Sequence, residues 1–135
     1  MAMMLDADVL IRAEKEQFDL EAWLRGRGDE PLEIAAITAA EIWHGVERAS
    51  GAQRERRQRF VERLLSRLPI IPYTAETARE HARVWAELEA AGRRSGSHDM
   101  IVAATARLRG STLATFNRQH FEHVPGLTII HPPQN

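Results

Sequence analysis

Residues 2–11 read Ala-Met-Met-Leu-Asp-Ala-Asp-Val-Leu-Ile, an apolar run that is interrupted by two aspartates. Residues 2–6 are predicted to form a short strand that ends in the carboxylate of Asp6. The apolar residues 9–11 continue into the first turn of a helix. The stretch therefore predicts a strand–helix unit with a carboxylate at the point where the strand ends.

The same alternation of short strands and amphipathic helices continues along the chain. Further strands are predicted at 32–37, 70–71, 112–115 and 127–130, and helices at 17–26, 38–50, 53–68, 74–91 and 97–108. Thr38 is predicted to cap its helix, with Glu41 completing a capping box, and Gly51 to end that helix. Short strands that alternate with helices are typical of a parallel sheet covered by helices. The predicted fold class is α/β, with three α/β/α layers, a short central parallel sheet and a single domain over residues 1–135.

The composition excludes several classes of protein. Apolar residues make up 44% of the chain and there is no cysteine, which excludes disulfide frameworks, zinc ribbons and thiol nucleophiles. No window of about 18 residues is apolar enough to cross a membrane, and Asp6 comes too early for a signal peptide. A cytoplasmic protein without membrane contact is expected. The net charge of −1 neither indicates nor excludes a nucleic-acid partner.

Three of the nineteen acidic residues are distinguished by their positions. Asp6 closes the first strand, Glu41 lies in the first turn of the helix after the second strand, and Asp99 begins the helix after a glycine-rich loop. In a parallel sheet with right-handed connections, these positions share the edge where ligands bind. Each lies in apolar sequence with no lysine nearby, so a hard cation such as Mg²⁺ or Mn²⁺ is predicted to bind them. The alternative is structural, because acids in a first helical turn offset the helix dipole.

Four segments resemble the motifs of PIN-domain nucleases, and in particular those of the VapC-like toxins of bacterial toxin–antitoxin pairs. They follow the family's order and span nearly the whole chain: Leu-Asp-Ala-Asp-Val-Leu-Ile at 5–11, Thr-Ala-Ala-Glu-Ile-Trp-His-Gly at 38–45, Asp-Met-Ile-Val-Ala-Ala-Thr-Ala at 99–106 and Leu-Ala-Thr-Phe-Asn-Arg-Gln-His-Phe at 113–121. Each motif alone has low specificity, whereas the four together are strongly specific.

The resemblance implies a PIN-like fold and a metal-dependent endoribonuclease, in which a metal-activated water hydrolyses the phosphodiester bonds of RNA. It carries catalytic roles over to Asp6, Glu41, Asp99 and Asn117. The three acids are the implied metal ligands, and the implied ion is Mg²⁺, with Mn²⁺ as the alternative. The implied partners are an RNA substrate, a VapB-like antitoxin that neutralises the toxin, and a second copy of the chain in a homodimer.

Several positions depart from the family's pattern. Asp8 stands where the family usually has Asn, and we expect it to accept backbone amides rather than to bind metal. Asn117 stands where many relatives have Asp, so it can offer an amide oxygen but no charge. His120 replaces an acid that is common in relatives. His44 and His98 lie beside two of the acids in sequence and are additional candidates for contact with the metal or a phosphate.

Two other functions remain open on the sequence. Because Asn117 supplies no charge, the chain could be a PIN-fold module that binds RNA or protein without cutting it. Asp6-Ala-Asp8 after a strand also resembles the start of haloacid-dehalogenase-like phosphatases, in which the first Asp is a nucleophile. That family needs a downstream lysine, and Lys15, the only lysine, lies too early. Metal-dependent cleavage of RNA that chelation abolishes would exclude the binding module.

Overall fold

The apolar residues at the start of the chain form the central strand of a parallel sheet. The computed structural model describes residues 2–133, within which five strands have the order β3-β2-β1-β4-β5. β1 (Met3–Leu5) lies between β2 (Leu32–Ala35) and β4 (Thr112–Ala114), and all the pairings are parallel. Every side chain of β1 is buried because helices cover both faces of the sheet, which explains its continuous apolar sequence.

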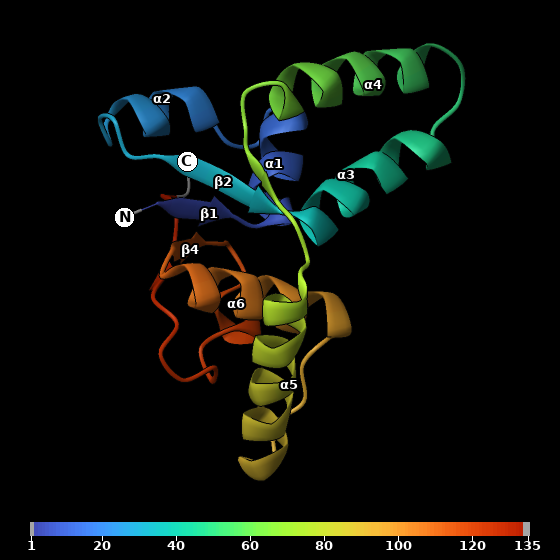
Figure 1. Ribbon diagram of the computed structural model, residues 1–135. Helices are drawn as coiled ribbons and strands as arrows, with labels where there is room; N and C mark the ends of the chain where they lie inside the picture. The colour runs from blue at the N-terminus through green and yellow to red at the C-terminus, as the bar shows by residue number, and fades with distance from the viewer. Residues whose placement is uncertain (1, 134–135) are drawn as a thin grey trace.

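The helices lie in two layers on either side of the sheet (Figure 1). One layer holds α1 (Ala7–Glu14), α2 (Leu20–Arg25), α3 (Ala36–Arg48) and α4 (Gly51–Leu65), and the other holds α5 (Ala75–Ala90) and α6 (Ser97–Arg109). The outer strands are β3 (Ile70–Ile71) and β5 (Ile129–Ile130), and a 3-10 turn, η1, covers Arg118–His120. The predicted α/β fold with three layers is confirmed. Among residues 2–133, every helix is too short or too polar to span a lipid bilayer.

Each layer of helices packs on the sheet through its own apolar core. On the side of α1–α4, the buried residues include Phe18, Ile42 and Val61. On the side of α5 and α6, they include Val84 and Phe121. Because both faces of the sheet are closed by packing, only its edges are left to form a site.

Several predicted boundaries are wrong. β2 ends at Ala35 rather than at residue 37, because its pairing with β3 ends there, opposite Ile71. α3 therefore begins at Ala36, so Thr38 is a buried residue inside the helix rather than its cap, and the predicted capping box is not formed. Gly51 begins α4 instead of ending α3. The last strand is confined to Ile129–Ile130.

Candidate active site

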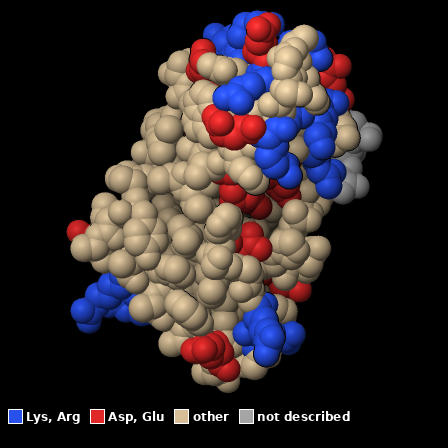
Figure 2. Space-filling view, turned by 90° about the vertical axis from the view of Figure 1, so that its right-hand side faces the viewer, with Lys and Arg blue, Asp and Glu red and all other residues tan. Residues whose placement is uncertain are grey.

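The predicted acids gather at the carboxyl edge of the sheet. Asp6 follows β1 and caps α1, where its Oδ1 accepts a hydrogen bond from Ala7 N–H at 2.9 Å. Asp8 lies in the first turn of α1 and Asp99 in the first turn of α6. Glu41 lies in the second turn of α3 rather than the first, since α3 begins earlier than predicted. Figure 2 shows acidic side chains near the middle of one face, between a large uncharged area and the many charged side chains at the top of the view.

Thr115, a fully buried residue just after β4, connects two of these carboxylates. Its Oγ1 lies 2.9 Å from Asp6 Oδ2 and 3.3 Å from Asp8 Oδ2, and it accepts a hydrogen bond from Asn117 N–H at 3.0 Å. A hydroxyl has one proton and donates to one carboxylate at a time, and the shorter distance favours Asp6. Thr115 thus fixes the orientation of Asp6 from the neighbouring strand.

Asp8 holds the loop that follows β4. Its Oδ2 accepts hydrogen bonds from Phe116 N–H at 3.0 Å and from Asn117 Nδ2 at 2.8 Å. Asp8 therefore accepts a backbone amide, as predicted, whereas the prediction that it does not bind metal stays a prediction. Its other oxygen, Oδ1, is buried and has no hydrogen-bond partner among the described residues.

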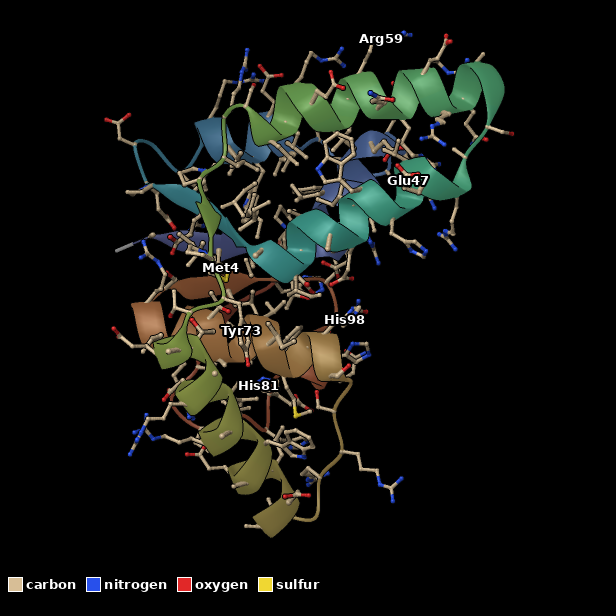
Figure 3. The ribbon with its side chains drawn as sticks, turned by 45° about the vertical axis from the view of Figure 1, so that its right-hand side comes forward. Met4, Glu47, Arg59, Tyr73, His81 and His98 are labelled. Carbon is tan, nitrogen blue, oxygen red and sulfur yellow. The ribbon has the colours of Figure 1, made fainter. Side chains whose placement is uncertain are left out.

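Two histidines border the outer carboxylates. His98 Nδ1 lies 3.8 Å from Glu41 Oε1, and His120 Nδ1 lies 3.3 Å from Asp99 Oδ2. Both rings are about half-exposed, and Figure 3 shows His98 at the start of α6. His44, by contrast, lies on the exposed side of α3. The sequence signal for His120 was its place in the motif after β4, which brings it to the same edge as the acids.

Burial raises the pKa of all four carboxyl groups. The pKa of Asp6 rises from 3.8 to about 7, through burial first and then through repulsion from Asp8. Burial likewise raises the pKa of Asp8, Glu41 and Asp99, and the charge of Asp99 further raises that of Glu41. Within residues 2–133 no arginine or lysine forms an ion pair with any of the four. The edge therefore concentrates negative charge, which Arg12, His98 and His120 nearby offset only in part.

The site suits a divalent cation in its chemistry, although its side chains are not gathered into a cage. Within the described range, no three His, Asp or Glu side chains are grouped closely enough to hold an ion. Carboxylate oxygens are nevertheless the ligands that Mg²⁺ prefers. The partnerless Oδ1 of Asp8 and the mutual repulsion of the carboxylates are two features that a cation would relieve.

A further buried carboxylate lies at the opposite, amino edge of the sheet, and the sequence did not single it out. Glu33 in β2 is 3% exposed, and its Oε2 accepts a hydrogen bond from Arg109 Nε at 2.8 Å. Its Oε1 accepts a short hydrogen bond from Ser111 Oγ. Glu33 is thus neutralised within the chain and belongs to the framework rather than to the site.

Comparison with known proteins places this geometry in a family. The sequence model that describes the PIN domain family matches residues 3–127 of this chain. Ribonuclease VapC2 from Haemophilus influenzae is 33% identical over 92% of each chain, and the tRNA(fMet)-specific endonuclease VapC from Shigella flexneri is 34% identical over 70% of each. The structure of VapBC2 from Rickettsia felis bound to a promoter DNA fragment contains a similar chain, with 26% identity, a TM-score of 0.89, and coverage of 98% of this chain and 100% of that one. A chain of DNA-bound VapBC from Salmonella typhimurium is 29% identical, with a TM-score of 0.85 and coverage of 97% and 98%. This chain belongs to the PIN domain family and, within it, to the VapC proteins.

Proposed function

We propose that this VapC protein is an endoribonuclease, the toxin of a toxin–antitoxin pair, and that its reaction requires a divalent metal ion. The observation that carries the proposal is the cluster at the carboxyl edge, where Asp6, Glu41 and Asp99 lie together and none of the three pairs with an arginine or lysine of the described chain. The ribonuclease names of the VapC relatives support the activity. Since RNA is the substrate, the proposed location is the cytoplasm.

Each site residue has a proposed role in this reaction. Asp6, Glu41 and Asp99 would hold the ion, which we propose to be Mg²⁺, with Mn²⁺ as the alternative. When bound, such an ion polarises a phosphate oxygen and lowers the pKa of a water molecule. Thr115 orients Asp6 by donating a hydrogen bond to it. Asn117, through its hydrogen bond to Asp8, keeps the loop after β4 against the site.

The test is cleavage of RNA by the antitoxin-free protein in Mg²⁺, in Mn²⁺ and in EDTA. Cleavage is expected to need metal and to be lost in Asp99→Asn. Asp29→Asn is the matched control, because Asp29 is exposed in the loop between α2 and β2. Equal cleavage by the wild type and Asp99→Asn would contradict the proposed site.

The same assay decides between the nuclease and the non-cleaving module. If the wild type binds RNA but does not cut it with either metal, the binding module is the better description. The phosphatase alternative has lost its support, because the chain is a PIN protein and because Asp8 is hydrogen-bonded to Phe116 N–H and Asn117. A phosphatase would need that second aspartate as a free general acid.

The antitoxin partner is proposed to dock in an apolar groove between α1, α2 and α4. The groove has a volume of about 720 Å³, and its apolar lining includes Phe18, Leu24 and Phe60. Its rim is acidic in the segment between α1 and α2 and at the start of α2, and basic at the end of α4 and just beyond it, where Arg63 and Arg67 lie. The VapBC complexes among the structural relatives support an antitoxin as the occupant, and an amphipathic helix fits a groove of this kind. Leu24→Arg is expected to abolish co-purification with the co-expressed antitoxin while leaving metal-dependent cleavage intact, and unchanged co-purification would contradict this surface.

The homodimer is proposed to form through the outer face of α5 and the segment before it. Tyr73 and Trp85 are about half-exposed there, and His81 lies between them, hydrogen-bonded to Tyr73 Oη at 2.9 Å and stacked on Trp85 (Figure 3). A cluster of exposed aromatic rings is typical of a protein interface. Sedimentation of the wild type as a dimer and of Trp85→Glu as a monomer is expected. If both sediment as the same species, the interface lies elsewhere.

A further inference from the structure

An arginine borders the acidic edge at the point where α1 meets the loop after β4. Arg12 lies one helical turn beyond Asp8, and its Cζ is 4.2 Å from the centre of the Phe116 ring. That ring is itself fixed, because Phe18 and His131 pack against it at centroid distances of 5.2 Å and 5.3 Å in edge-on geometry. The guanidinium of Arg12 therefore rests on a rigid aromatic platform.

Arg12 forms no ion pair within the described part of the chain, although its charge lies near enough to lower the pKa of Asp8. Arg12 differs in this from the seven arginines that do form ion pairs with carboxylates there. These are Arg25, Arg27, Arg54, Arg57, Arg83, Arg107 and Arg109. An arginine that stacks on a ring through its face keeps its N–H edge for planar acceptors. Arg12 is only half-buried, so that edge remains accessible to a ligand.

The platform is built from the same loop as the acidic edge. The backbone N–H of Phe116, whose ring supports Arg12, donates to Asp8 Oδ2, and Asn117 donates to the same oxygen. α1 thus contacts the loop that carries Thr115 and Asn117 at two places, through Asp8 and through Arg12. A group held by Arg12 would lie next to the carboxylates, at a position set by the fold.

RNA needs such a group, because the carboxylates repel its phosphates. A planar guanidinium binds a phosphate through two parallel hydrogen bonds. We propose that Arg12 binds a backbone phosphate of the RNA, next to the phosphate that is cleaved, and so positions the strand across the carboxyl edge. This inference rests on the proposed nuclease function. It assigns Arg12 a positioning role, since the reacting atoms would be held by Asp6, Glu41 and Asp99.

The test measures RNA binding apart from cleavage. Binding of a short fluorescein-labelled single-stranded RNA is followed by anisotropy in EDTA, over a series of salt concentrations, for the wild type and Arg12→Gln. The loss of one charge-assisted contact is expected to weaken binding about tenfold. The slope of log K against log salt should fall by about 0.7, the value for one phosphate contact on a single strand.

Arg59→Gln is the matched control, because Arg59 points outward from α4, away from the carboxyl edge (Figure 3). It is expected to bind RNA as the wild type does. Equal affinity and slope for the wild type and Arg12→Gln, or equal losses in Arg12→Gln and Arg59→Gln, would overturn the proposal. Thermal unfolding checks that each variant is folded.

Arg12→Lys keeps the charge and the apolar stem, so it can replace Arg12→Gln in the binding measurement if Arg12→Gln does not fold. The proposal predicts an affinity between those of wild type and Arg12→Gln, with the salt slope of the wild type, because lysine lacks the planar fork. Wild-type affinity in Arg12→Lys would contradict recognition by the guanidinium.

Cleavage in Mg²⁺, measured in parallel, separates this inference from the function on which it rests. If the wild type cleaves RNA and Arg12→Gln binds it normally, only the role of Arg12 fails. If the wild type binds through Arg12 but never cleaves, the nuclease proposal fails and the phosphate contact stands.

Discussion

Buried carboxylates lie at both edges of the sheet, and those at the two edges differ in whether an arginine pairs with them. At the amino edge, Glu33 receives hydrogen bonds from Arg109 and Ser111, so its charge is neutralised inside the protein. At the carboxyl edge, burial and then the charges of Asp8 and Asp99 raise the pKa of Asp6, and no arginine or lysine forms an ion pair with Asp6 or Asp99 among the described residues. A buried acid that has its own cation stabilises the fold, whereas buried acids without one are suited to binding a cation from outside.

The largest expected effect separates two glutamates on the same helix. Glu41 lies at the carboxyl edge, whereas Glu47, also on α3, is exposed and pairs with Arg54 (Figure 3). Glu41→Gln is expected to lower the rate of RNA cleavage about 1,000-fold, because the ion that Glu41 would help to hold is the group that stabilises transition-state charge. Glu47→Gln is expected to cleave at the wild-type rate. Similar rates for the two variants would show that the position of Glu41 at the carboxyl edge gives it no special role in cleavage.

The second effect is on stability as a function of pH. Because the pKa of Asp6 is raised to about 7 in the folded state from 3.8, the folded protein holds more protons than the unfolded chain between these values. Its contribution to stability is present below pH 3.8 and is lost as pH rises through 7. In EDTA, the free energy of unfolding is expected to fall between pH 5 and pH 8 by about 3 kcal/mol.

Asp6→Asn isolates this contribution. Urea unfolding of the variant should give a smaller loss of stability between pH 5 and pH 8 than the wild type shows. Mg²⁺ is expected to raise the wild-type stability at pH 8, where the carboxylate is ionised, and to leave Asp6→Asn nearly unchanged. Identical pH profiles for the two proteins would contradict the raised pKa.

The third effect tests the opposite edge. Glu33→Ala leaves Arg109 and Ser111 without their shared acceptor and is expected to lower the free energy of unfolding by about 2 kcal/mol. The value lies below that of a fully buried pair because Arg109 is half-exposed. Cleavage by the folded protein should be unaffected. Glu89→Ala, at an exposed position on α5, is the control for urea unfolding.

The smallest effect concerns the hydroxyl that connects two of the aspartates. Thr115→Val keeps the shape of the side chain but removes a donor to Asp6 and an acceptor for Asn117 N–H. A loss of about 1 kcal/mol in the free energy of unfolding is expected. Thr115→Ser should restore both stability and cleavage, and failure of this rescue would show that the methyl group matters more than the hydroxyl.

The sequence alone was sufficient to predict the buried central strand and the edge of the sheet at which the acids meet. The apolar run before Asp6 predicts a buried strand, and the placement of Glu41 and Asp99 at the starts of later helices predicts that all three meet at one edge. The prediction worked because a parallel sheet with right-handed connections leaves one place for such residues. The metal-binding role of these acids stays a prediction.

The contacts between side chains were beyond the sequence. Thr38 matches a capping pattern, but β2 ends where its pairing with β3 ends, and the local sequence does not encode that pairing. The pairing of Glu33 with Arg109 joins residues 76 positions apart and has no sequence motif. The stacking of Arg12 on Phe116 likewise depends on how α1 packs against the loop after β4.

The central place of β1 has a consequence for how the protein is made. β1 pairs on one side with β2 and on the other with β4, whose residues are more than 100 positions later. During translation β1 therefore cannot pair with β4 until the ribosome has synthesised residues 112–114. Asp99 and Asn117 also come late in the chain. A chain interrupted before this point lacks the complete carboxyl edge, so a stalled ribosome would release no working enzyme into the cell that makes it.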